Sequence, residues 1–129
     1  MKKKGILNRE LAGIFAKLGH NDQIVIADCG LPIPKDVTCI DLSLKIGEPT
    51  FLTVLEVVIA DLAVEKAIFA NEIIDANPHI YNQLTQQSFP VEQVTHERFK
   101  EMTNQAKVII RTGEATPYAN IILQSGVIF

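Results

Sequence analysis

The sequence predicts an α/β protein built around a largely parallel β-sheet, on two main observations. Short apolar runs typical of buried strands alternate along the chain with segments in which apolar residues recur at helical spacing. The chain of 129 residues also has the length of one ordinary domain, and no internal repeat, low-complexity segment or linker divides it. Such alternation is typical of strand-helix-strand connections, which place neighbouring strands in the same direction. We therefore expect a single domain over residues 1–129.

The first helix and the first strand have the clearest signals. Asn8 can cap a helix that Gly19 ends. The apolar residues of this segment share one helix face at the i, i+3, i+4, i+7 spacing: Leu11, Ile14, Phe15 and Leu18. Residues 24–27 then form a wholly apolar run, which predicts a buried strand that ends at Asp28.

The remaining elements are predicted from the same kinds of signal. Proline suits the first turn of a helix, and glycine or polar residues mark the ends of strands. In this way we expect strands near residues 37–42, 67–69, 91–95, 107–112 and 120–124, and helices over about residues 50–61, 77–84 and 96–105. Phe99 and Met102 are expected to face inward from the last of these helices.

Charge and hydropathy argue against several classes of function. The net charge of −3, without a basic stripe, argues against nucleic-acid binding. No apolar run approaches the roughly 20 residues of a membrane-spanning helix. Lysines at positions 2–4 resemble the start of a signal peptide, but Asn8, Arg9 and Glu10 interrupt any apolar segment after them. We therefore expect a cytoplasmic protein with no nucleic-acid or membrane partner.

Neither a metal nor a cofactor is predicted. Cys29 and Cys39 lie ten residues apart, without a Cys-x-x-Cys pair or a matching histidine cluster, so we expect two small buried apolar side chains. The chain also lacks a glycine-rich dinucleotide motif, a phosphate-binding Gly-Lys-Ser/Thr element, a nucleophile elbow and a His-Glu-x-x-His zinc motif. No cofactor-dependent chemistry is therefore indicated.

His20 is a candidate for proton transfer, because histidine is the side chain that most readily exchanges a proton near neutral pH. It follows the predicted end of the first helix. Asp28 ends the first strand, where ligands of open α/β sheets commonly bind. A second interpretation is structural, since the helix dipole favours a histidine at that end and aspartate commonly forms turns. Spacing alone favours the structural interpretation.

Two further segments carry polar groups that suit a small ligand. His96 and Lys100 lie four residues apart, so on a helix they share a face from which the lysine can donate to a hydroxyl; solvent exposure is the alternative. Residues 112–120 offer a carboxylate, hydroxyls, a phenol and an amide, a mixture that suits a polyol but also any turn-rich connection. His79 is expected on the surface.

Longer segments are more specific than these single residues. Residues 4–8 read KGILN, residues 19–34 include GHND and IVIADCGLPIP, and residues 111–123 read RTGEATPYANIIL. Together these segments closely resemble the D-ribose pyranase family over the whole chain. The related fucose mutarotases share the Gly-His and Asp elements and typically lack the Gly-Leu-Pro-Ile-Pro segment, which favours the ribose branch.

The resemblance implies a three-layer α/β/α fold, a ring-shaped homo-oligomer, often a decamer, and cofactor-free interconversion of the pyranose and furanose forms of free β-D-ribose. It implies that His20 is the proton donor and that Lys100 is a further ligand contact. It also implies a sugar-binding set: Asp28, His96, Tyr118, Ala119 and Asn120. Cys29 stands where many relatives have alanine, a change expected to affect packing only. His20 is accordingly expected in a cavity close to residues 118–120.

We expect His20 to protonate the ring oxygen of the sugar, while Asp28 orients the imidazole or holds a hydroxyl. Two alternatives stay open: a mutarotase for fucose or another free sugar, and a non-catalytic sugar-binding subunit. A phosphorylated sugar is less favoured, because only Lys100 and Arg111 are evident phosphate partners and no glycine-rich helix start accompanies them. The apolar residues 126–129 suit either a subunit contact or a terminal strand docked in its own domain.

Overall fold

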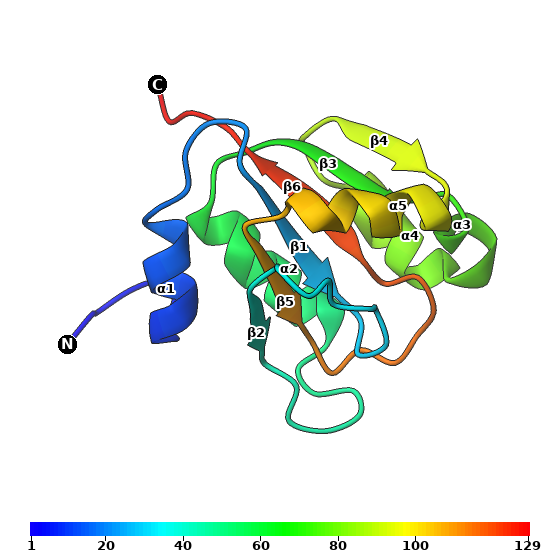
Figure 1. Ribbon diagram of the computed structural model, residues 1–129, viewed down its shortest axis with the longest axis horizontal. Coiled ribbons are helices and arrows are strands. Elements are labelled where there is room, and N and C mark those ends of the chain that lie inside the picture. Colours follow the sequence, from blue (N-terminus) through cyan, green and yellow to red (C-terminus); the bar gives the residue numbers. More distant parts are fainter.

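Six strands form the central sheet of this computed structural model, which describes residues 1–129 (Figure 1). In chain order they are β1 (Gln23–Ala27), β2 (Cys39–Asp41), β3 (Val64–Ala70), β4 (Val91–Val94), β5 (Val108–Arg111) and β6 (Ile121–Ser125). Their order across the sheet is β2-β5-β1-β6-β3-β4. Strand β6 runs antiparallel to both of its neighbours, and all other pairs are parallel. The predicted mainly parallel sheet is therefore confirmed.

Helices cover both faces of this sheet. In chain order they are α1 (Arg9–Phe15), α2 (Phe51–Asp61), α3 (Ile73–Ala76), α4 (Pro78–Thr85), α5 (His96–Met102) and the 3₁₀ turn η1 (Thr103–Gln105). Residues of α1, α2 and α4 pack on one face in a cluster of 20 buried residues, while Phe99 of α5 packs on the other face. Figure 1 shows α5 in front of the sheet, with α2 and α4 behind it. This is the expected three-layer α/β/α arrangement.

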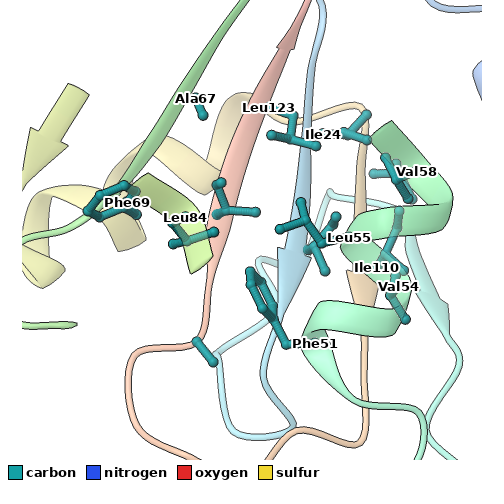
Figure 2. Packing of buried hydrophobic residues seen from close by; sticks show 14 of the residues in the cluster. Ile24, Phe51, Val54, Leu55, Val58, Ala67, Phe69, Leu84, Ile110 and Leu123 are labelled. Atoms are coloured by element: carbon teal, nitrogen blue, oxygen red, sulfur yellow. The ribbon is translucent and has the colours of Figure 1, made fainter. Parts of the chain in front are cut away.

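The alternation of side chains along β1 explains how one strand serves both layers. Ile24 and Ile26 belong to the larger cluster, and Val25 and Ala27 belong to the cluster under α5. Figure 2 shows the larger cluster, in which Leu55 of α2 faces the sheet. Full burial of one such aliphatic side chain contributes about 1.5–3 kcal/mol. A shift of one residue in register would exchange the two sets, so packing strongly specifies where β1 ends.

Most predicted elements are confirmed within a few residues of their expected ends. Asn8 caps α1, since the backbone N–H of Leu11 donates to Asn8 Oδ1 over 3.0 Å. The helix ends earlier than predicted, at Phe15, because the chain continues in a tighter turn in which Leu18 N donates to Phe15 O. The short helix α3 was not predicted, because the apolar run before it resembles a strand.

The two cysteines do not have the burial expected from the sequence. Cys39 is exposed and Cys29 is half-buried, and both are free thiols. The expectation of two buried apolar side chains is wrong for Cys39 because β2 is an edge strand, of which only Ile40 faces the core. None of the helices is both long enough and apolar enough to cross a membrane.

Candidate functional site

A cavity of about 290 Å³ opens at the edge of the sheet where the parallel strands end. It lies between the loop that follows β1, the segment that precedes β6 and the first residue of α5. Its volume is at the small end of the range for ligand pockets, which suits a molecule of monosaccharide size. The residues that line it are Asp28, Gly30, Leu31, Pro32, His96, Pro117 and Tyr118. Three predicted site residues from distant parts of the chain thus meet here: Asp28, His96 and Tyr118.

The Asp28 carboxylate is held in a fixed position within this cavity. Asn120 Nδ2 donates to Asp28 Oδ2 over 2.9 Å, and Asn120 Oδ1 accepts the Asp28 backbone N–H over 2.8 Å. The Gly30 N–H donates to Asp28 Oδ1 over 2.9 Å. A carboxylate oxygen can accept more than one hydrogen bond, so Asp28 keeps the capacity to accept a ligand hydroxyl. Asn120 itself is buried and orients Asp28 from behind.

The imidazole of His96 forms another wall of the cavity. The His96 backbone N–H donates to both carboxylate oxygens of Glu72, at 3.0 and 2.9 Å, which fixes the start of α5. Its ring meets the ring of Tyr118 edge-on, with centroids 5.0 Å apart. Nδ1 of His96 is buried and has no hydrogen-bond partner. Because Nδ1 is buried, Nε2 is the ring nitrogen that remains for contact with a ligand.

The segment before β6 has a special backbone geometry. Tyr118 adopts a left-handed conformation with φ of 57°, and Ala119 directs its side chain into the buried core. Such a conformation is uncommon for a residue other than glycine and persists where the surrounding structure holds it. Asn77 supplies part of that support, because its Nδ2 donates to Thr116 Oγ1 over 2.8 Å and to Pro117 O over 2.9 Å.

Glu114 also supports the segment before β6, although Glu114 itself does not line the cavity. Its buried carboxylate accepts the Phe51 backbone N–H at the start of α2 over 3.0 Å and the Thr116 hydroxyl over 2.9 Å. The Thr112 hydroxyl is likewise directed inward, to Ala27 O over 2.8 Å. The polar loop over residues 112–120 therefore offers fewer groups to a ligand than its composition suggests, since most of them hold the loop itself.

The two cations considered as phosphate partners are already paired. Lys100 Nζ lies 2.6 Å from Glu97 Oε1, one turn back on α5, and Lys100 does not line the cavity. Arg111 NH1 donates to Asp41 Oδ2 over 2.9 Å, and its Nε and NH2 both donate to Cys29 O. Arg111 thereby anchors the loop that carries Asp28. The role of Lys100 as a further ligand contact therefore stays a prediction.

His20 lies at the opposite edge of the sheet. His20 precedes β1 and Asp28 follows that strand, whose five residues span about 16 Å at ~3.3 Å per residue. The expectation that His20 lies in one cavity with residues 118–120 is therefore wrong for a single chain. Instead, His20 Nε2 lies 3.2 and 3.3 Å from the two carboxylate oxygens of Glu65. This hydrogen bond is the main cause that lowers the pKa of Glu65 below its ordinary value, followed by one from Gln124.

Several residues of the site were missed by the sequence analysis. Leu31, Pro32 and Pro117 form apolar walls, and the unusual Pro content around residues 32–34 was the available signal. Glu72 and Asn77 act on the site from another part of the chain, and no local pattern points to them. His79 is exposed on α4, as predicted.

Other depressions of the surface offer a different set of groups. One of about 300 Å³ beside α1 is lined by Lys17, Asp22 and Lys107, and it contains neither an imidazole nor a phenol. A larger depression of about 360 Å³ between α2 and α4 contains one titratable side chain, Glu56. No three histidine, cysteine, aspartate or glutamate side chains lie close enough together to hold a metal ion. The chemistry available at the cavity is thus that of Asp28, His96 and Tyr118: one carboxylate, one imidazole and one phenol between apolar walls.

The fold and this cavity define a small α/β protein that binds a small polar molecule at the carboxyl edge of its sheet. The chain belongs to the RbsD / FucU transport protein family, whose model matches residues 1–128.

Two relatives are similar to this chain over its full length. A D-ribose pyranase of Halalkalibacterium halodurans is 58% identical over 129 residues, which cover 100% of both chains. The structure of Bacillus subtilis RbsD complexed with D-ribose is 53% identical, covers 100% of both chains and superposes with a TM-score of 0.97. FucU from Bifidobacterium longum, at 24% identity with 95% of this chain and 97% of that chain covered, shares the fold with a TM-score of 0.79.

Proposed function

We propose that this protein is an isomerase with D-ribose pyranase activity, which interconverts β-D-ribopyranose and β-D-ribofuranose. The observation that carries this function is the full-length similarity to D-ribose pyranases, together with a cavity that presents Asp28, His96 and Tyr118. We also propose a cytoplasmic location, which stays a prediction of the sequence.

The polar groups of the cavity favour an unphosphorylated sugar. Asp28 offers carboxylate oxygens as acceptors, and the ring of His96 presents Nε2. Tyr118 adds an aromatic ring that can stack on a sugar face and a hydroxyl that can bond to it. Lys100 and Arg111 are each paired with a carboxylate, so neither of these two cations is free for a phosphate. Asn120 contributes through Asp28, and Ala119 through its backbone.

The position of His20 leads us to propose a site shared between two copies of the chain. His20 can reach a sugar held by Asp28 only if it comes from a second copy, because β1 separates the two residues within one chain. The exposed apolar tail supports such contacts, since Ile128 and Phe129 are 93% and 101% exposed. The tail begins after Ser125, whose backbone is hydrogen-bonded to Asn21 and Asp22 in the turn that carries His20. The alternative of a tail docked in its own domain is wrong. We therefore propose a homo-oligomer, and the family resemblance implies a decamer.

The reaction then needs two proton transfers on ring opening, two on ring closure, and no cofactor. On ring opening, the bond between C1 and the pyranose ring oxygen breaks, His20 donates a proton to that oxygen, and the anomeric hydroxyl loses its proton as the aldehyde forms. On closure, the hydroxyl at C4 attacks C1 and releases its proton, and the aldehyde oxygen regains one. General acid-base catalysis contributes roughly 10²- to 10⁴-fold per group, or about 3–5 kcal/mol of the barrier.

Saturation-transfer NMR on free D-ribose tests this function. The wild-type protein should raise the rate of pyranose-furanose exchange in proportion to its concentration, and a His20→Ala protein should lose roughly 10²- to 10⁴-fold of that acceleration. His79→Ala is the matched control, because His79 is exposed on α4 and lines no part of the cavity. Full acceleration by the His20→Ala protein would exclude His20 as the proton donor. No acceleration by the wild-type protein would instead favour a non-catalytic sugar-binding subunit.

A further inference from the structure

We propose that Glu65 is a positioning residue that fixes the tautomer and the direction of the His20 imidazole. The inference rests on the proposed function, in which His20 exchanges a proton with the sugar. Glu65 lies at the start of β3, 45 residues beyond His20 in the sequence, so no local motif connects the two.

The contact between these residues is specific in its atoms. His20 Nε2 lies 3.3 Å from Glu65 Oε1 and 3.2 Å from Oε2, so the nitrogen faces the fork of the carboxylate. The two side chains are 48% and 45% exposed. An ion pair with this exposure stabilises a fold very little, so its geometry matters here more than its contribution to stability.

The backbone is shaped to place Glu65 at this point. Val64 pairs with Ser125 and Lys66 pairs with Gln124, so Glu65 is an extra residue in a β-bulge of β3. A bulge redirects a side chain relative to the regular strand, and bulges are common next to active sites. The backbone at Gly126 passes close to Glu65, since a Cβ at position 126 would lie 3.2 Å from the Glu65 Cβ. The residues on both strands therefore accommodate the bulge.

A second hydrogen bond holds the carboxylate from the other side. Gln124 Nε2 donates to Glu65 Oε2 over 3.2 Å and to Asn21 Oδ1 over 3.0 Å. Asn21 follows His20 directly and adopts a left-handed conformation with φ of 71°. The side chains of Asn21, Gln124 and Glu65 thus form a series of hydrogen bonds. Asn21, at one end of the series, follows His20 in the sequence, and Glu65, at the other end, contacts the His20 imidazole. Lys66, the neighbouring cation, is held by Glu92 on β4 at 3.0 Å.

This arrangement decides which ring nitrogen can react. A carboxylate can only accept a hydrogen bond, so in the neutral ring the proton sits on Nε2, which faces Glu65. Nδ1 then carries the free lone pair. When the ring takes a second proton, Nδ1 becomes the donor. Proton exchange with the sugar therefore runs through Nδ1, and Glu65 keeps that nitrogen directed away from β3. Carboxylates commonly orient histidines in this way at other functional sites.

The test is a ¹⁵N NMR measurement of the His20 tautomer, made at a pH where the ring is neutral. Wild-type protein should show the Nε2–H form, and Glu65→Ala should shift His20 toward a mixture of both forms. Glu65→Gln keeps an oxygen acceptor and should restore the Nε2–H form. Glu92→Ala is the matched control, because it removes an exposed carboxylate from the neighbouring strand that does not touch His20.

Steady-state exchange rates are measured on the same samples. For Glu65→Ala we expect kcat to fall about 10- to 100-fold, the effect typical of losing the hydrogen-bond partner of a metal-bound histidine, with little change in the KM for ribose. Glu65→Gln should recover part of this loss. An unchanged His20 tautomer in Glu65→Ala, or a changed tautomer with unchanged kcat, would overturn the inference. Acceleration by the wild-type protein tests the proposed function separately.

Discussion

Asn120 and Asp28 are joined by a pair of hydrogen bonds, one from Nδ2 to the Asp28 carboxylate over 2.9 Å and one to Oδ1 from the Asp28 backbone over 2.8 Å. The Asn120 amide therefore fixes both the backbone and the side chain of Asp28, the residue that follows β1. Because Asn120 is buried, water cannot take over the hydrogen bonds that its amide makes to Asp28. The direction of the Asp28 carboxylate depends on this one side chain and on the Gly30 N–H.

Asn120→Ala should weaken ribose binding more than it weakens the fold. Loss of the amide leaves the partly buried Asp28 N–H without its acceptor, which costs about 1–3 kcal/mol of unfolding free energy. It also frees the Asp28 carboxylate to turn away from the cavity. Calorimetric titration with ribose and urea denaturation measure the two effects. Asn104→Ala removes an exposed amide that bonds only to Glu101 O, and both quantities should stay unchanged.

Glu114→Ala should destabilise the protein by about 2 kcal/mol, because it leaves the buried N–H of Phe51 at the start of α2 without an acceptor. Glu114→Gln should cost less, since its amide oxygen still accepts that N–H and its amide nitrogen can donate to Thr116 Oγ1. Urea denaturation gives both values. Equal stability of the Ala and wild-type proteins would contradict this role for Glu114.

Two glycines should respond to alanine in opposite directions. A Cβ at Gly113 would collide with the backbone of Glu48, so Gly113→Ala should destabilise the protein by about 2–4 kcal/mol. Gly13 lies within α1 with open space around it, so Gly13→Ala should stabilise the protein by about 0.5–1 kcal/mol through helix propensity. Thermal unfolding of the two variants side by side checks both signs.

The carboxyl pKa of Glu65 should be lower in the wild-type protein than in His20→Ala, because the hydrogen bond from His20 favours the charged carboxylate. A group whose folded-state pKa is depressed contributes stability that is present above its unfolded pKa and is lost as pH falls through the folded pKa. The His20–Glu65 contact should therefore break on the acidic side of the usual glutamate range. Carbon-13 NMR titration of the Glu65 carboxyl measures this difference, and identical titrations in the two proteins would exclude the contact in solution.

The fold was largely predictable because its signals are local. The Asn8 cap and the apolar run of β1 depend on residues close together in the chain, and both are confirmed. The ends of the first helix and of α5 were less predictable, since both helices finish in tighter turns that periodicity does not distinguish from a helix. The exposure of Cys39 depends on the strand order, which no local pattern specifies.

The site was predictable only in part, for two different reasons. The pairings of Arg111 with Asp41 and of Glu65 with His20 join strands and turns that the sequence does not place side by side. The separation of His20 from Asp28, by contrast, was derivable, because the predicted strand lies between them and forces them to opposite edges of the sheet. The family resemblance named both residues without indicating that one chain keeps them apart.

A mixing experiment tests the shared site most directly. His20→Ala and Asp28→Ala proteins are each expected to lose the acceleration of ribose exchange. Co-expressed in equal amounts, they should form mixed oligomers in which about a quarter of the sites combine an intact Asp28 cavity with an intact His20 from a second copy. Saturation-transfer NMR should then show exchange recovered to about that fraction of the wild-type rate. Mixed oligomers, verified by mass spectrometry, that are no more active than either parent protein would contradict a site built from two copies.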